Sequence, residues 1–112
     1  SADDMIAYYS DFVDSIKASL PDSKIYILSI PPVTAAREQA ENEAIQNSDI
    51  DSYNSKLLKL ADSKELYYVD INTALKGNDG KLPESDAAED GMHFQKATYR
   101  VMLDYILSHV AK

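Results

Sequence analysis

Only two segments of this 112-residue chain have the composition of a β-strand. Residues 24–30 (KIYILSI) are short, β-branched and aromatic, and residues 66–71 (LYYVDI) are nearly all apolar. Neither segment shows regular alternation of polar and apolar residues, which is typical of strands buried on both faces of a parallel sheet. Pro31 and Pro32 end the first strand, because proline cannot donate a hydrogen bond to the ladder. We therefore predict two parallel strands.

Helical segments surround these strands. Apolar residues recur at helical spacing in residues 3–20, 51–63 and 95–110. Residues 34–47 are polar and rich in alanine and glutamate, which indicates an exposed fourth helix. Strands that alternate with helices favour a parallel sheet with right-handed crossovers. The prediction is an α/β fold in the order α-β-α-α-β-α, with residues 1–112 forming a single partial domain.

Two parallel strands are too few for an independent sheet. Both would keep an exposed edge, and a pair of strands has little capacity for stability by itself. The chain is therefore expected to be part of a larger sheet or to take further strands from a second copy.

Composition excludes several classes of function. The formal net charge is −8, and an acidic surface repels phosphate backbones and anionic lipid, so no nucleic-acid partner is expected. The longest apolar runs, such as residues 25–28, are too short to span a bilayer. The chain contains no cysteine, which excludes disulfides and zinc–thiolate sites and fits both a secreted bacterial protein and a cytosolic one.

One histidine stands in a chemically suggestive position. His93 lies in the segment DGMHF (residues 90–94), in the loop that follows the second predicted strand. Functional residues of open parallel sheets gather in such loops. Asp90 can fold back to accept a hydrogen bond from Nδ1–H of His93, which would leave Nε2 free as a general base. The other histidine, His109, is predicted to cap the end of the last helix.

Two other interpretations of this loop remain open. With 13 aspartates in the chain, an aspartate three residues before a histidine also arises by chance. Asp90 and His93 could instead be an i, i+3 metal pair, helped by Glu84, Asp86 and Glu89, although these are few ligands.

The longer segment DGMHFQKATY (residues 90–99) resembles the last sequence block of the SGNH hydrolases, also called GDSL-type lipases and esterases. That block has the pattern Asp-Gly-x-His and an apolar residue, then a small residue and a tyrosine that open the final helix. Residues 9–32 resemble a helix and the fourth strand of that family. Residues 51–60 and 67–70 resemble the next helix and the fifth strand, so the resemblance covers essentially the whole chain.

The resemblance implies the C-terminal portion of a three-layer α/β/α parallel-sheet fold of the flavodoxin-like type, with two parallel strands and about four helices. It also implies a serine ester hydrolase in which Asp90 orients His93 and His93 takes the proton from a serine. No cofactor is implied. The family and the absence of cysteine slightly favour an extracellular or cell-surface location.

The chain departs from the family in one respect. The Gly-Asp-Ser nucleophile motif and the oxyanion blocks are absent, and Ser29, Ser63 and Asn54 lie in strand or helix patterns that do not match them. We therefore expect the chain alone to be inactive and to associate with a serine-bearing N-terminal half or with a second copy. The ester substrate would belong to the intact parent protein. The alternative is a non-catalytic interaction or dimerisation domain with the same partial fold.

Overall fold

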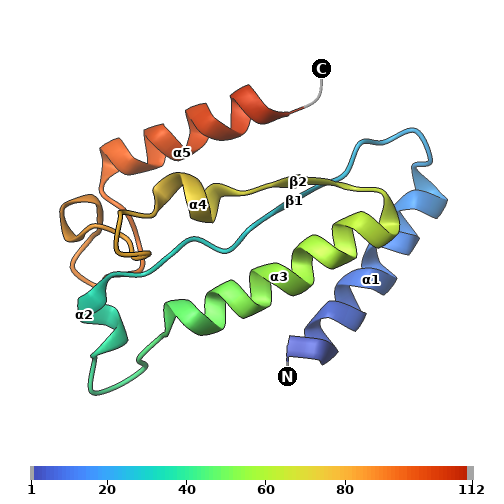
Figure 1. Cartoon of the computed structure of the whole chain (residues 1–112). Helices are drawn as coiled ribbons and strands as arrows, with labels where there is room; N and C mark the ends of the chain where they lie inside the picture. The colour runs from blue at the N-terminus through green and yellow to red at the C-terminus, as the bar shows by residue number, and fades with distance from the viewer. Residues whose placement is uncertain (1, 111–112) are drawn as a thin grey trace.

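The computed structural model describes residues 2–110, and its elements form three layers (Figure 1). In chain order these elements are α1 (Ala2–Ser19), β1 (Tyr26–Leu28), α2 (Ala35–Glu38), α3 (Asn47–Lys64), β2 (Tyr67–Val69), α4 (Ile71–Leu75), the 3-10 helix η1 (Glu84–Asp86) and α5 (Lys96–His109). The strands lie between α1 and α3 on one face and α5 on the other. The predicted α/β architecture is therefore confirmed, with five α-helices in residues 2–110 where about four were expected.

The two strands form a short parallel pair. Tyr26 lies opposite Tyr67, and their rings stack with centroids 4.8 Å apart. The ladder continues past β1, since the N–H of Ser29 donates to the carbonyl of Val69 at 3.0 Å. Both strands end earlier than the sequence predicted, because Ile30 and Asp70 bond to groups outside the ladder.

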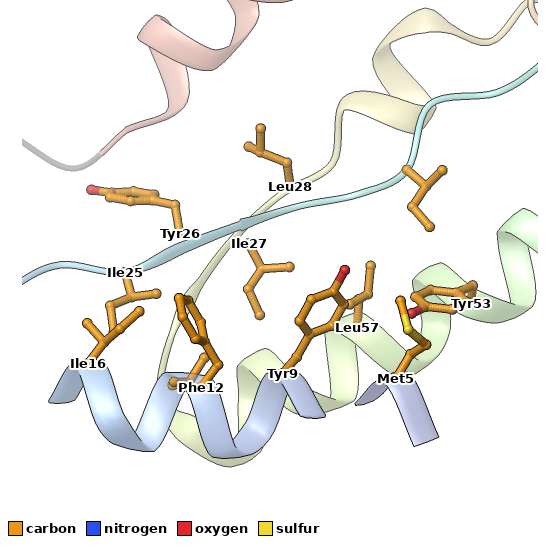
Figure 2. A pocket seen from close by; sticks show the side chains of 12 residues that line it. Met5, Tyr9, Phe12, Ile16, Ile25, Tyr26, Ile27, Leu28, Tyr53 and Leu57 are labelled. Atoms are coloured by element: carbon orange, nitrogen blue, oxygen red, sulfur yellow. The ribbon is translucent and has the colours of Figure 1, made fainter. Parts of the chain in front are cut away.

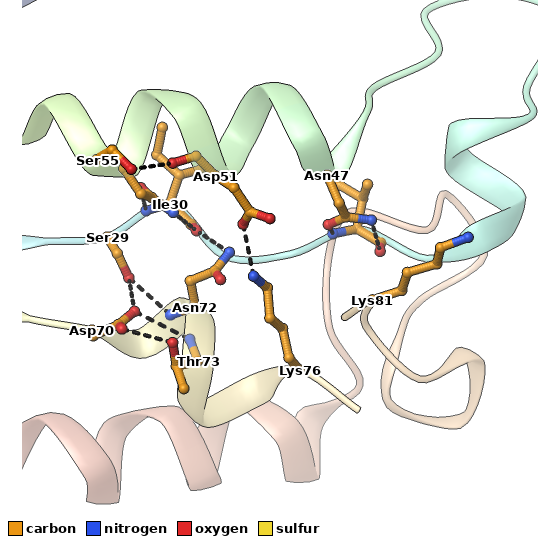
Figure 3. Close-up of polar contacts among 12 residues, drawn as sticks. Ser29, Ile30, Asn47, Asp51, Ser55, Asp70, Asn72, Thr73, Lys76 and Lys81 are labelled. Carbon is orange, nitrogen blue, oxygen red and sulfur yellow. Dashed lines mark hydrogen bonds and ion pairs between the residues drawn. The ribbon is translucent and has the colours of Figure 1, made fainter. Parts of the chain in front are cut away.

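Asp70 ends β2 by starting a helix that the sequence analysis did not predict. Its carboxylate accepts hydrogen bonds from Thr73 N at 3.1 Å and Thr73 Oγ1 at 2.7 Å, which caps α4 (Figure 3). Ser29 Oγ donates to the same carboxylate at 3.1 Å and accepts from Asn72 N at 2.8 Å. The expected strand over residues 66–71 therefore stops at Val69, and Ile71 is the first residue of α4.

The helix expected over residues 34–47 is wrong beyond its first turn. After α2 the chain reverses at Glu43, which has a left-handed φ of 56°, and Ile45 N donates back to the carbonyl of Arg37 at 3.4 Å. Helix α3 then begins at Asn47 and not at 51 as predicted, because the Glu38 carboxylate accepts from Asn47 N at 2.9 Å and supplies the first turn with an acceptor.

A cluster of apolar side chains beneath α5 supports the loop that carries the candidate site. Leu75, Leu82, Ala87 and Phe94 are buried together, and Met102 of α5 packs against them. The loop between α4 and α5 is therefore anchored at several points along its length. Within residues 2–110, no helix combines the length and the apolar character needed to cross a membrane.

Candidate functional site

Residues 87–94 form a short loop whose two ends are joined. Ala87 and Phe94 make an antiparallel bridge, and Ala88 N donates to the carbonyl of His93 at 2.8 Å. The side-chain amide of Gln95 donates to the carbonyl of Ala87 at 2.8 Å. Since Ala87 and Phe94 are also buried, the base of the loop is fixed and its tip presents residues 89–93.

Asp90 contacts His93 through both carboxylate oxygens. Asp90 Oδ1 accepts from the backbone N–H of Met92 at 2.9 Å and of His93 at 2.8 Å. Asp90 Oδ2 forms a hydrogen bond with Nδ1 of the His93 ring. The sequence predicted this contact from the spacing of the two residues, and the structure contains it.

The electrostatics of the contact select one form of the histidine. The hydrogen bond with the His93 ring, together with the backbone N–H groups of His93 and Met92, holds the pKa of Asp90 far below its ordinary value. An ionised carboxylate only accepts hydrogen bonds, so the shared proton belongs to His93 Nδ1. In the neutral ring Nε2 then carries a lone pair. The His93 side chain is 67% exposed, so the ring is accessible to another group.

Gly91 allows the loop to approach the segment after β1 closely. Its φ is +70°, and a Cβ at this position would lie 2.4 Å from Thr34 Oγ1 and 2.9 Å from Arg37 Cβ. The carbonyl of Gly91 accepts from the N–H of the fully buried Thr34 at 3.1 Å. Only glycine therefore fits between Asp90 and the start of α2 without displacing a neighbour.

The serines and the asparagine named in the sequence analysis have structural partners. Ser29 is 2% exposed and is bonded to Asp70 and Asn72. Ser63 Oγ donates to the carbonyl of Leu60 at 3.0 Å. The side-chain amide of Asn54 is bonded to the backbone N–H and carbonyl of Ile30. These three side chains form hydrogen bonds within the fold, and none is arranged as a nucleophile or an oxyanion donor.

The remaining candidates are separate from this pair. His109 is exposed in the last turn of α5, where its Nδ1 lies 2.7 Å from the carbonyl of Tyr105, as expected for a residue at a helix end. Glu84 instead accepts a hydrogen bond from Ala36 N at 3.2 Å. Among residues 2–110, no three histidine, aspartate or glutamate side chains come together in a way that could hold a metal ion.

Sequence reasoning missed the groups that brace the loop from a distance. Arg37 Nη1 donates to the backbone carbonyl of Asp90 at 3.3 Å, and Asn47 holds the backbone of Val33. These residues are far from residue 90 in the sequence, and each lies in a segment that looked like an exposed helix. The only local signal was the Thr34 cap, whose Oγ1 accepts from Arg37 N at 3.1 Å.

A family model described as "GDSL-like Lipase/Acylhydrolase family" matches residues 1–101 of the chain. The search of curated proteins found no match to the chain. The fold is similar to that of a Streptococcus pneumoniae protein described in connection with platelet activating factor, with a TM-score of 0.86 and 22% identity, over 96% of this chain and 51% of that one.

Two further solved structures are similar in fold. A GDSL-like lipase from Bacteroides thetaiotaomicron has a TM-score of 0.73 and 17% identity, over 96% of this chain and 51% of that one. A lipase/acylhydrolase from Enterococcus faecalis has a TM-score of 0.66 and 15% identity, over 92% of this chain and 50% of that one. The chain therefore spans about half the length of the solved structures that it matches.

Proposed function

This chain belongs to the GDSL-like lipase/acylhydrolase family, and we propose that it supplies the aspartate and the histidine of a Ser-His-Asp triad in an ester hydrolase. The observation that carries the proposal is the hydrogen bond between Asp90 and Nδ1 of the exposed His93 ring. Such a contact orients an imidazole and fixes its tautomer, which is what a general base in acyl transfer requires.

In this mechanism His93 Nε2 takes the proton from a serine hydroxyl as the serine attacks the ester carbonyl. The imidazolium that forms is stabilised by the Asp90 carboxylate, which stays ionised. His93 then gives the proton to the leaving alcohol, and an acyl-serine intermediate remains. A water molecule, deprotonated in turn by His93, hydrolyses this intermediate and releases the acid. The serine and the oxyanion donors would come from a part of the protein outside these 112 residues.

The chain alone is expected to be inactive, because loss of the nucleophile from a triad lowers the rate by several orders of magnitude. The measurement is hydrolysis of p-nitrophenyl butyrate by the purified chain, with the variant His93→Ala as the control for background catalysis. Equal rates for the two proteins are expected. Serine-dependent turnover by the chain alone would contradict the proposal.

An apolar trough on the surface of the chain supports the proposal of a partner. A trough of about 560 Å³ runs between α1, β1 and α3. Figure 2 shows side chains of these elements directed into it, including Tyr9, Phe12, Ile27 and Leu57. The trough is lined without charged residues. The buried hydroxyl of Tyr53 beside it has no hydrogen-bond partner among the described residues. An exposed apolar surface of this kind supports the proposal that another polypeptide covers it.

The sheet points to the same partner. Within residues 2–110 the sheet contains only β1 and β2, so one edge of β1 pairs with no strand. The solved structures that the chain matches are about twice as long. These observations support a partner that adds strands beside β1 and covers the trough, either a serine-bearing half of the same family or a second copy of this chain.

The triad is tested in the whole protein encoded by the natural gene. The sequence upstream of Ser1 is expected to encode a Gly-Asp-Ser motif, and His93→Ala in that protein should lower kcat by about a thousandfold or more with little change in KM. Matched replacement of His109, at the far end of α5, should leave kcat unchanged. An upstream sequence without a serine motif would instead support the alternative, a non-catalytic dimerisation domain, which the trough also fits.

A further inference from the structure

Arg37 contacts the backbone of Asp90, not its carboxylate. Its Nη1 donates to the Asp90 carbonyl at 3.3 Å, across 53 positions of sequence. The side chain is only 13% exposed, and its Nε is buried without a hydrogen-bond partner among the described residues. Glu43, the carboxylate nearest to Nη2 at 3.7 Å, is 87% exposed and therefore a weak partner. The Asp90 carbonyl is thus the principal partner of this buried guanidinium.

Two successive carbonyls of the loop are held from the same side. Arg37 binds the carbonyl of Asp90, and the N–H of Thr34 binds the carbonyl of Gly91. Gly91 has no side chain, so Thr34 Oγ1 and Arg37 Cβ lie directly against it. These two bonds fix the peptide between Asp90 and Gly91, which adjoins the Cα that carries the Asp90 carboxylate.

The support behind Arg37 is itself rigid. Helix α2 is a single turn that is capped by Thr34 and bonded at Ala36 N by the Glu84 carboxylate. Glu38 in the same turn binds Asn47 and forms an ion pair of 3.0 Å with Lys81. A side chain mounted on such a turn can hold its partner in place at small entropic cost.

Acidic residues also lie near Arg37. A cavity of about 200 Å³ beside it is lined by Glu84, Glu89 and Asp90, and Arg37 is the only basic residue that the structure places in its lining. These carboxylates favour a cation at the position of Arg37.

We propose that Arg37 is a positioning residue for the Asp90–His93 pair: its guanidinium holds the Asp90 carbonyl so that the Asp90 carboxylate engages Nδ1 of His93. The inference deepens the proposed function, on which its catalytic meaning rests, and it assigns Arg37 no contact with substrate.

The test measures the histidine tautomer in the purified chain, so it needs neither a serine nor a substrate. With ¹⁵N-labelled histidine at about pH 8.5, where imidazole is neutral, the wild type should show His93 mainly in the Nδ1–H form. Arg37→Met keeps an unbranched apolar stem but removes the guanidinium and its donors, and should lower the ratio of Nδ1–H to Nε2–H about tenfold. Arg37→Lys retains a cationic N–H donor group and should restore most of the ratio.

Arg100→Met is the matched control, because Arg100 is 80% exposed on α5 and its nearest carboxylate, Asp104, is 3.9 Å away. It should leave the ratio unchanged. An unchanged ratio in a folded Arg37→Met chain would overturn the inference. If that variant unfolds and loses its dispersed amide spectrum, the guanidinium signals of Arg37 are measured in the wild type instead. Slow rotation and slow hydrogen exchange of the Arg37 guanidinium support the contact with Asp90. Fully averaged signals refute it.

The outcome is separate from that of the hydrolysis experiment. A tautomer ratio that responds to Arg37 while the whole protein hydrolyses no ester would leave the positioning role intact and refute the triad. A whole protein that hydrolyses esters, with a tautomer ratio that does not respond to Arg37, would support the triad and refute the positioning role of Arg37.

Discussion

Asn47 and Asn54 lie two turns apart on α3, and each side-chain amide pairs with both backbone groups of one residue in the segment that follows β1. Asn54 accepts from Ile30 N at 2.7 Å and donates to Ile30 O at 3.0 Å. Asn47 makes the same two bonds with Val33, at 3.0 and 2.9 Å. The two amides thus act as strand partners on either side of Pro31 and Pro32, which have no N–H to pair.

Removal of one of these amides should be costly. Asn54→Ala leaves the partly buried N–H of Ile30 without an acceptor, and we expect the free energy of unfolding to fall by about 1 to 3 kcal/mol. Urea unfolding followed by circular dichroism measures the change. Asn78→Ala, in an exposed turn, is the control and should change stability by less than about 0.5 kcal/mol. Equal losses in the two variants would show that the amide pairs contribute nothing specific.

Gly91→Ala and Gly80→Ala separate steric conflict from backbone strain. Both glycines have positive φ, at +70° and +78°, so both variants incur the cost of a left-handed alanine, about 1 kcal/mol. A Cβ at Gly80 meets no atom within 4 Å, whereas one at Gly91 meets Thr34 Oγ1. We expect Gly91→Ala to lose about 1 to 3 kcal/mol more than Gly80→Ala in urea unfolding. Similar losses would mean that the loop moves away from Thr34 freely.

Asp90 should give stability a specific dependence on acid. Its pKa is lower in the folded chain than in the unfolded one because of the His93 contact. Its contribution is therefore fully present above the unfolded carboxyl pKa of about 4, and it is lost as the pH falls from there towards the folded value. Asp90→Asn cannot titrate, so its deficit relative to wild type should shrink below about pH 4.

Urea midpoints measured from pH 7 down to pH 2.5 give this comparison. Asp104→Asn, an exposed change on α5, serves as the control. A deficit of Asp90→Asn that is constant over the whole range would show that the carboxylate does not interact with His93 in solution.

The trough should control association of the isolated chain. Phe12 is 58% exposed and lines it, so we expect the wild type to self-associate with rising concentration when no other partner is present. Phe12→Arg should sediment as a monomer at all concentrations. Tyr8→Arg alters a residue that is 70% exposed on the same helix but outside the trough, and should behave as wild type. A wild type that is monomeric at every concentration would contradict this expectation.

The sequence predicted the elements whose pattern is local. The amphipathic segments at residues 3–20 and 95–110 correspond to α1 and α5, and both apolar runs contain a strand. Helix α4 was missed because Asp70 and Thr73 form a cap that falls inside an apolar run. The end of α2 and the start of α3 were predicted wrongly, because the chain between them is held by the contact of Asn47 with Val33. Hydrophobic periodicity does not predict such a contact.

In the candidate site, too, the local contact was predicted and the long-range contacts were not. Asp90 and His93 are neighbours in one loop, so their spacing was enough to predict the contact between them. Arg37 and Thr34 approach the loop only because β1 and β2 lie side by side and bring their following segments together. The catalytic use of the pair stays a prediction, since it requires a serine from outside these residues.

The separation of these contacts along the chain also orders them in time. Asp90 and His93 are three positions apart and can meet within a single turn, whereas Arg37 reaches Asp90 across 53 positions. Short loops close within tens of nanoseconds, and long-range contacts form with the whole domain. Before the long-range contacts form, Asp90 and His93 would therefore meet only in transient turns, because Arg37 does not yet hold the Asp90 carbonyl. The hydrogen bond between Asp90 and His93 is therefore expected to become persistent only when the whole domain has folded.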